Sequence, residues 1–96
     1  MKITSKQRQY LRGLAHSLNP YIIIGKNGLN KSSIKSIDKS LKDHELIKVK
    51  IQIGDKKQLA PLIEKETNSS VIGIIGKIII LYRFSPDKGD DSIKIP

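Results

Sequence analysis

The sequence lacks several residues and patterns that define common classes of small protein. It contains no cysteine, which excludes a disulfide framework and a zinc site built on thiolates. Only 4% of its residues are aromatic, too few for a sheet that stacks nucleobases on aromatic rings, as RRM domains do. The longest apolar stretches, residues 21–24 and 78–82, are far too short to span a bilayer, so no membrane association is expected.

Catalytic and metal-binding patterns are also missing from the sequence. Its two histidines, His16 and His44, have neither a nucleophile-and-base arrangement nor metal-ligand spacing around them. We therefore expect no enzyme activity, no cofactor and no small-molecule substrate. The N-terminal residues show no secretory signal, which predicts a cytoplasmic protein.

Negative charge is scarce, and it is unevenly distributed along the 96 residues. The chain has 18 Lys and Arg against 9 Asp and Glu, a formal net charge of +9. Residues 1–50 carry 11 basic and 3 acidic side chains, a charge of +8, whereas residues 51–96 carry 7 basic and 6 acidic, a charge of +1. A charge of this size and sign predicts a polyanionic partner, contacted mainly by the first half of the chain.

Hydrophobic periodicity predicts three helices and four strands. We expect helices at about residues 5–18, 31–43 and 55–68, and strands at 21–24, 46–53, 71–75 and 78–83. The first two strand-to-strand crossings each contain a helix, which implies parallel pairing, and the last two strands form an antiparallel hairpin. The sequence thus predicts an α/β protein (α+β, two layers) of order αβαβαββ with a mixed four-stranded sheet. It would form one domain over residues 1–84, with a polar, disordered tail at 85–96.

Helix starts are marked by capping residues. Thr4, with a glutamine three residues later, has the form of a capping box, and Asp55 is followed by a glutamine at the same spacing. Asn30 is suited to cap the second helix. Pro61 falls inside the third helix, where we expect it to kink the helix or delay its regular part.

The turn Gly25-Lys26-Asn27-Gly28 is the strongest candidate for a binding site. It joins a buried strand to a helix, carries Lys26 at its tip, and is followed by Lys31 and Lys35 in the first turns of that helix. Backbone N–H groups at a helix N-terminus favour a phosphate oxygen, and KH domains clamp RNA backbone with a GxxG loop. The alternative is an ordinary turn in which glycine supplies a positive φ.

Further basic residues lie on the first helix and on the second strand. Arg8, Arg12 and His16 follow a spacing of four, so they share one helix face, and arginine is suited to bidentate phosphate contact. Lys48 and Lys50 point to the solvent side of an alternating strand. Each set is either part of a nucleic-acid surface or simply a solvated face.

Four blocks of the sequence, in order, resemble the YhbY family, the free-standing bacterial versions of the CRM domain (chloroplast RNA splicing and ribosome maturation). The resemblance extends over roughly residues 2–84. The blocks are Ser5–Arg12, Ile24–Leu29, Asp43–Val49 and a last block that runs from Ile75–Lys77 through Leu81–Arg83.

The resemblance implies a fold, a partner and a site. The family fold is a compact αβαβαββ domain similar to the C-terminal domain of translation initiation factor three. Its members bind RNA and associate with precursors of the large ribosomal subunit. Carried over to this chain, the RNA-binding residues would be Arg8, Arg12, Gly25, Lys26, Asn27 and Gly28. Independently of the resemblance, Lys31 and Lys35 in the first turns of the second helix are expected to contact the neighbouring backbone.

Two other functions are compatible with the same basic surface. One is a sequence-tolerant DNA-binding protein, which would bind duplex DNA as well as or better than structured RNA. The other is an adaptor whose basic face docks on an acidic protein partner, and whose binding would survive nuclease treatment. The sequence carries no signal for the oligomeric state.

Overall fold

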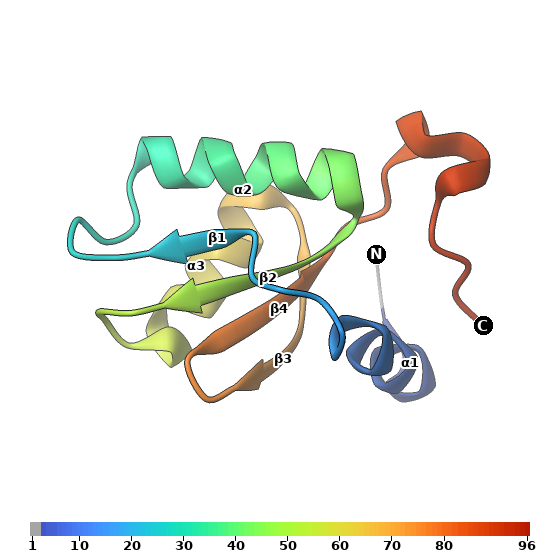
Figure 1. The fold of residues 1–96 in the computed structure, drawn as a ribbon, viewed down its shortest axis with the longest axis horizontal. Coiled ribbons are helices and arrows are strands. Elements are labelled where there is room, and N and C mark those ends of the chain that lie inside the picture. Colours follow the sequence, from blue (N-terminus) through green and yellow to red (C-terminus); the bar gives the residue numbers. More distant parts are fainter. Residues whose placement is uncertain (1–2) are drawn as a thin grey trace.

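The predicted order of helices and strands is confirmed. The computed structural model describes residues 3–96, and within them no helix is long and apolar enough to cross a membrane. The elements follow the chain as α1 (Ser5–Ala15), β1 (Ile22–Ile24), α2 (Lys31–His44), β2 (Leu46–Ile51), α3 (Lys56–Thr67), β3 (Ser70–Ile75), β4 (Ile78–Tyr82) and the 3₁₀ segment η1 (Pro86–Asp91) (Figure 1).

The four strands form one mixed sheet in the order β1-β2-β4-β3. β1 pairs with β2 in parallel, as predicted from the helix that joins them. The second parallel pairing was predicted wrongly, because β4 inserts between β2 and β3 and is antiparallel to both. β4 is apolar at nearly every position and is mostly buried, which suits a central strand better than an edge.

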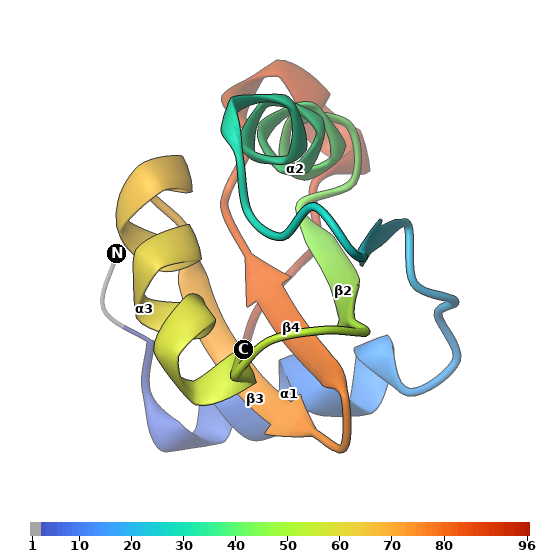
Figure 2. The same ribbon diagram turned by 90° about the vertical axis from the view of Figure 1, so that its left-hand side faces the viewer.

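Helices lie on both faces of the sheet. Figure 2 shows α2 and α3 on one side of the strands and α1 on the other. The two-layer prediction therefore describes α2, α3 and the sheet, while α1 adds partial cover to the opposite face. The hydrophobic core is accordingly split into two clusters by the sheet.

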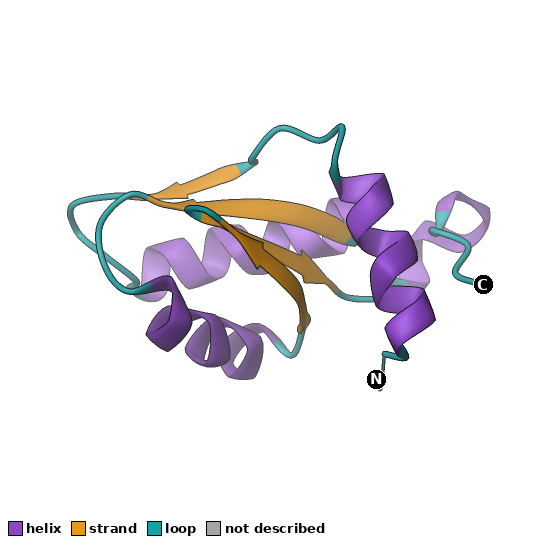
Figure 3. Ribbon diagram, turned by 90° about the horizontal axis from the view of Figure 1, so that it is seen from below, coloured by secondary structure: helices purple, strands orange, loops and turns teal. Residues whose placement is uncertain are grey.

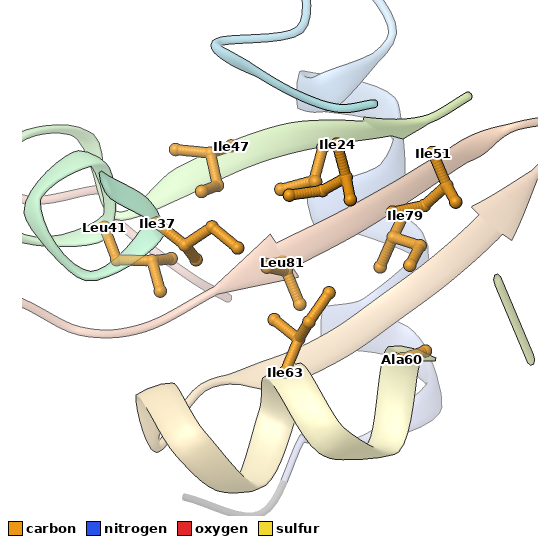
Figure 4. Close-up of a cluster of buried hydrophobic side chains, with 10 residues drawn as sticks. Ile24, Ile37, Leu41, Ile47, Ile51, Ala60, Ile63, Ile79 and Leu81 are labelled. Atoms are coloured by element: carbon orange, nitrogen blue, oxygen red, sulfur yellow. The ribbon is translucent and has the colours of Figure 1, made fainter. Parts of the chain in front are cut away.

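The larger cluster fills the space between the sheet and the pair α2 and α3 (Figure 4). Its buried members are Ile24, Ile37, Leu41, Ile47, Val49, Ile51, Ala60, Ile63, Ile79 and Leu81. The smaller cluster lies under α1, and its buried members are Leu11, Ala15, Leu46, Ile72, Ile80 and Tyr82. Each predicted helix thus buries one apolar stripe against the sheet, which is the main source of its stability.

The helix caps follow the sequence closely. The Thr4 hydroxyl accepts from the Gln7 N–H at 3.1 Å and the Gln7 side chain accepts from the Thr4 N–H at 3.0 Å, the predicted capping box. Asp55 caps α3, but its carboxylate accepts from the Lys57 N–H at 2.9 Å, and no reciprocal bond from a glutamine is formed among the described residues. α3 continues through Pro61 to Thr67.

The segment after Phe84 differs from the disordered tail that the sequence predicts. Its backbone forms η1, and Ser85 is buried. Beyond η1, Ile93 and Ile95 pack against the cluster under α1. These two isoleucines follow a run of polar residues, so composition gave little sign of a packed segment. Figure 1 shows this segment at the end of the sheet away from the loop between β1 and α2.

Candidate nucleic-acid interface

The Gly25–Gly28 loop is a tight turn at the end of β1. The Gly28 N–H donates to the Gly25 carbonyl at 3.0 Å and closes the turn. Gly28 has a φ of +66°, a conformation that costs a glycine little and an L side chain about 1 kcal/mol or more. The second glycine of the motif is therefore required by the backbone of the turn.

The backbone amides near this loop fall into two groups. Those of Asn30 and Ser33 are used by a capping box, in which the Asn30 carboxamide accepts from the Ser33 N–H at 2.9 Å and the Ser33 hydroxyl accepts from the Asn30 N–H at 2.8 Å. Within residues 3–96 nothing accepts from the N–H groups of Lys26 and Asn27, or from those of Lys31 and Ser32 in the first turn of α2. Phosphate contact from the backbone is thus open to these four amides and closed to that of Gly28.

The lysines around the loop are exposed. Lys26 stands at the tip of the turn, and a cleft of about 270 Å³ separates the loop from the first turns of α2. Lys31 and Lys35, one helical turn apart, line a larger groove of about 820 Å³ between α2 and α3. Lys26, Lys31 and Lys35 therefore lie around the start of one helix, where the helix dipole adds to their positive charge.

Arg8 has a structural contact that its sequence position does not reveal. β3 contains an irregularity between Val71 and Gly73, where the pairing with β4 shifts register. One guanidinium nitrogen of Arg8 donates to the Val71 carbonyl and, at 3.3 Å, to the Ile72 carbonyl. The Glu64 carboxylate of α3 accepts from the Val71 N–H at 2.7 Å. Arg8 and Glu64 thus satisfy backbone groups beside the bulge in this edge strand.

Arg12 lies one turn after Arg8 and is exposed. Its aliphatic stem passes over Gly73, so close that a Cβ built on this glycine would lie 3.1 Å from the Arg12 Cδ. β3 and β1 are the opposite edges of the sheet. The two predicted halves of the site, the arginines of α1 and the Gly25–Gly28 loop, are therefore held by different edges and do not form one cluster.

The two strand lysines have different environments. The Lys48 ammonium donates to the Leu18 carbonyl at 2.9 Å and to the His16 carbonyl at 3.4 Å, so it binds the backbone at the end of α1. Lys50 points to the same face as Lys48 and makes no hydrogen bond or ion pair within the described part of the chain. Of these two residues, Lys50 is the one available to a ligand.

Glu45 is a residue whose importance sequence analysis missed. It follows the last residue of α2 with a φ of +65° and is fully buried. Its carboxylate accepts from the Ser85 N–H at 2.6 Å, from the Ser92 hydroxyl at 2.7 Å and from the Ile93 N–H at 2.7 Å. Burial raises the pKa of this carboxyl, but these hydrogen bonds and the charge of Lys88 outweigh it, so the pKa lies below its ordinary value of 4.5.

The described residues contain no group of three or more His, Cys, Asp or Glu side chains placed to hold a metal ion. His44, one of the two histidines, stacks its ring on Tyr21 at a centroid distance of 4.3 Å. The groups that the candidate interface presents to a ligand are lysine and arginine side chains and backbone amides, which are suited to binding an anion.

Comparison with known proteins gives relatives over nearly the whole chain. A Haemophilus influenzae protein named RNA-binding protein is 41% identical over 88 residues, which cover 88% of this chain and 89% of the relative. The Bacillus subtilis protein named probable RNA-binding protein YqeI is 37% identical over 97 residues, covering 98% of this chain and 99% of the relative.

A solved structure shares the fold. The solution structure of the Staphylococcus aureus protein SAV1595 is similar with a TM-score of 0.82 and 41% sequence identity, covering 99% of this chain and all of that one. The family model for the CRS1 / YhbY (CRM) domain matches residues 3–83. The chain therefore belongs to the CRS1/YhbY (CRM) domain family.

Proposed function

We propose that this chain is a non-enzymatic, cytoplasmic RNA-binding protein that associates with precursors of the large ribosomal subunit and assists their assembly. Membership of the CRM family and the names of its relatives support RNA as the partner. The ribosomal role is supported by the resemblance of the chain to the YhbY family. The net charge of +9 agrees with a polyanionic ligand.

The observation that carries the proposal is the arrangement of the Gly25–Gly28 loop. The unpaired N–H groups of Lys26 and Asn27 and the free end of α2 would hold one phosphate, with the Lys26 ammonium beside it. Lys31 and Lys35 would then contact the backbone that follows, along the groove between α2 and α3. Phosphate contacts of this kind position RNA without reading its sequence.

Arg8 and Arg12 enter the proposal with different roles. Arg12, which is exposed, would contact phosphate on the α1 side of the sheet. One guanidinium nitrogen of Arg8 donates to the β3 carbonyls, and its remaining N–H groups would be the ones that contact RNA. With about five phosphate contacts in all, log K should fall with log salt with a slope of about −3 to −4.

The test is sedimentation of the native protein through a sucrose gradient of cell lysate, with and without ribonuclease. We expect the protein to travel with large-subunit precursors and to be released by ribonuclease. A protein that stays at the top of the gradient in low salt would contradict the ribosomal role. Cosedimentation that survives ribonuclease would favour a protein partner, and stronger binding to duplex DNA than to structured RNA would favour DNA.

A further inference from the structure

The sheet face that carries α1 is covered more fully at one end than at the other. The sheet residues buried under α1 are Leu46 at the start of β2, Ile72 in β3, and Ile80 and Tyr82 in the middle and at the end of β4. Figure 3 shows α1 across this end of the strands, with the strands continuing beyond it toward the loops. Beyond these buried residues the face is less covered, since Ile78 is only partly buried against this cluster and Ile23 and Ile75 at the two edges are exposed. This part of the face lies next to the Gly25–Gly28 loop, which directly follows β1.

A row of four side chains crosses the open end of the sheet from one edge to the other. The strand register places Ile23 opposite Lys50, Lys50 opposite Ile78, and Ile78 opposite Ile75. Residues directly opposite each other point to the same face. Ile78 packs against the cluster under α1, which identifies the face. We call Ile23, Lys50, Ile78 and Ile75 the open row.

The open row exposes an unusual amount of apolar surface. Ile23 is 57% exposed and Ile75 is 62% exposed, although both belong to strands of the sheet. Two isoleucines at the two edges of one row, with a lysine between them, form an extended strip about 14 Å wide at ordinary strand spacing. Exposed apolar strips rimmed by polar groups often mark an interaction site.

Acidic side chains are absent from the elements around this strip. Within residues 3–96, all nine Asp and Glu residues lie in α2, in α3, at their caps or in the segment after Phe84, and none lies in α1, the Gly25–Gly28 loop or a strand. Lys50 lies within the row, Lys77 is in the turn that follows Ile75, and the Arg12 side chain passes over Gly73 of the same strand as Ile75. The open face is therefore apolar and cationic without a carboxylate, which favours a ligand that is both apolar and anionic.

We infer that a single-stranded segment of RNA crosses the sheet along the open row, with unstacked bases against Ile23 and Ile75 and phosphate beside Lys50. The inference rests on the proposed function. An RNA strand along the open row would also connect the two halves of the predicted site, the Gly25–Gly28 loop and the arginines of α1. Ile23 is two residues before Gly25, and Ile75 belongs to the strand over which Arg12 lies. Gln52, whose side-chain oxygen is 3.4 Å from a Cβ built on Gly25, lies between the row and the loop.

The chemistry of the strip favours single-stranded over double-stranded RNA. A duplex presents phosphate and ribose at its surface and keeps its bases stacked inside, so it has no partner for two exposed isoleucines. An unpaired base offers an apolar face to an exposed apolar side chain. Contact of a base with isoleucine contributes less binding energy than the aromatic stacking found in other single-strand binders, so each contact should stabilise the complex only modestly.

The main test is the double variant I23T/I75T. Threonine keeps the β-branched shape that strands prefer and removes apolar surface at two exposed positions, so the fold is preserved. We expect this variant to bind a short fluorescein-labelled oligouridylate about fivefold to tenfold more weakly by anisotropy, with the salt slope unchanged. Affinity for an RNA hairpin without a long loop should change less. The matched control is I74T, since Ile74 is 36% exposed on β3 and lies opposite Ile79, on the face that packs against α2 and α3.

The second test separates charge from apolar contact. K50Q should lower the salt slope for oligouridylate by about 0.7, the value for one phosphate on a single strand, whereas I23T/I75T should leave it unchanged. The control is K65Q in α3, where the lost charge is the same and no open-row contact is removed. A slope that responds equally to K50Q and K65Q would contradict a contact at Lys50.

The outcomes distinguish this inference from the proposed function. If I23T/I75T binds oligouridylate like the wild type while K26Q weakens binding, the loop binds RNA and the open row does not. If the wild-type protein binds the hairpin and not the oligouridylate, the single-strand inference is overturned and RNA binding stands. If the wild type binds neither RNA, both proposals fall.

Discussion

The carboxylate of Glu45 accepts a hydrogen bond of 2.6 Å from the backbone N–H of Ser85, which follows it by 40 residues. The same carboxylate also accepts from Ser92 and Ile93, so one buried side chain at the end of α2 binds the C-terminal segment at three points. Ser85 in turn donates its hydroxyl to the Lys42 carbonyl at 2.9 Å. The last twelve residues are thus connected to the end of α2 by charge-assisted hydrogen bonds, which are stronger than neutral ones.

Replacing Glu45 by glutamine should destabilise the protein. Glutamine keeps the size of the side chain but loses the charge, and it offers one oxygen acceptor where three donors converge. We expect the free energy of unfolding to fall by about 1.5–3 kcal/mol, measured by urea denaturation. The control is E66Q, an exposed position on α3 where the change should stay within about 0.5 kcal/mol. Equal effects of the two variants would show that the Glu45 hydrogen bonds contribute nothing.

The stabilisation from Glu45 should depend on pH in a defined direction. Its pKa in the folded protein is below the ordinary value of 4.5, so in the acid range the unfolded state binds more protons at this site. The contribution is therefore fully present above the unfolded pKa and is lost as the pH falls through the folded pKa. Urea denaturation of wild type and E45Q should give a stability difference that shrinks on going from neutral pH to about pH 3. A difference that stays constant would mean that Glu45 has the same pKa in both states.

Deleting residues 85–96 should weaken the fold. The deletion removes the three donors to Glu45 and uncovers the cluster under α1, against which Ile93 and Ile95 pack. We expect the truncated protein to remain folded over residues 1–84 but to lose about 2 kcal/mol or more of stability. Hydrogen exchange should show the extra opening at Leu11 and Tyr82 first. Unchanged stability would indicate that the segment is a dispensable tail.

K26Q should weaken binding to all RNA sequences alike. The Lys26 ammonium is expected to contact phosphate, which carries no sequence information. We therefore expect similar losses of affinity for several unrelated RNAs and a salt slope lower by about 0.7–0.9. K39Q is a useful comparison, because Lys39 is an exposed lysine farther along α2 that pairs with Asp43 at 3.2 Å. A loss confined to one RNA would show that Lys26 reads bases instead.

Arg8 and Arg12 should separate into two kinds of residue. Because Arg8 binds the carbonyls at the β3 bulge, R8A should lower the free energy of unfolding by about 1.5 kcal/mol. R12Q should leave stability nearly unchanged and weaken RNA binding with a smaller salt slope. Parallel urea titrations and anisotropy measurements on both variants check this. An R8A protein of wild-type stability would contradict the structural role.

The elements and caps were predictable because they depend on neighbours in the chain. The alternation of Leu46–Ile51 and the apolar stripes of the helices report which side of each element is buried, whatever it packs against. Thr4 and Asn30 cap their own helices through residues three positions away. The Gly25–Gly28 loop is equally local, and the positive φ of Gly28 agrees with its glycine.

Pairing between elements was decided only in the tertiary structure. A periodic pattern predicts the buried side of a strand but not its neighbour in the sheet. In the structure β4, and not β3, lies next to β2. The sign available in the sequence was that Ile78–Tyr82 is apolar at nearly every position, since a strand apolar on both sides belongs in the centre of a sheet.

The site residues also divide into those that depend on nearby residues in the chain and those that depend on long-range contacts. By itself, the sequence determined the helices, the strands, the basic character and the glycine turn, because each depends on composition or on residues a few positions apart. Only the tertiary structure decided that Arg8 binds a β3 bulge, that Glu45 binds the C-terminal segment, and that Ile23 and Ile75 lie in one row. Each of these joins residues distant in the chain, and such contacts depend on how the sheet brings separate elements together.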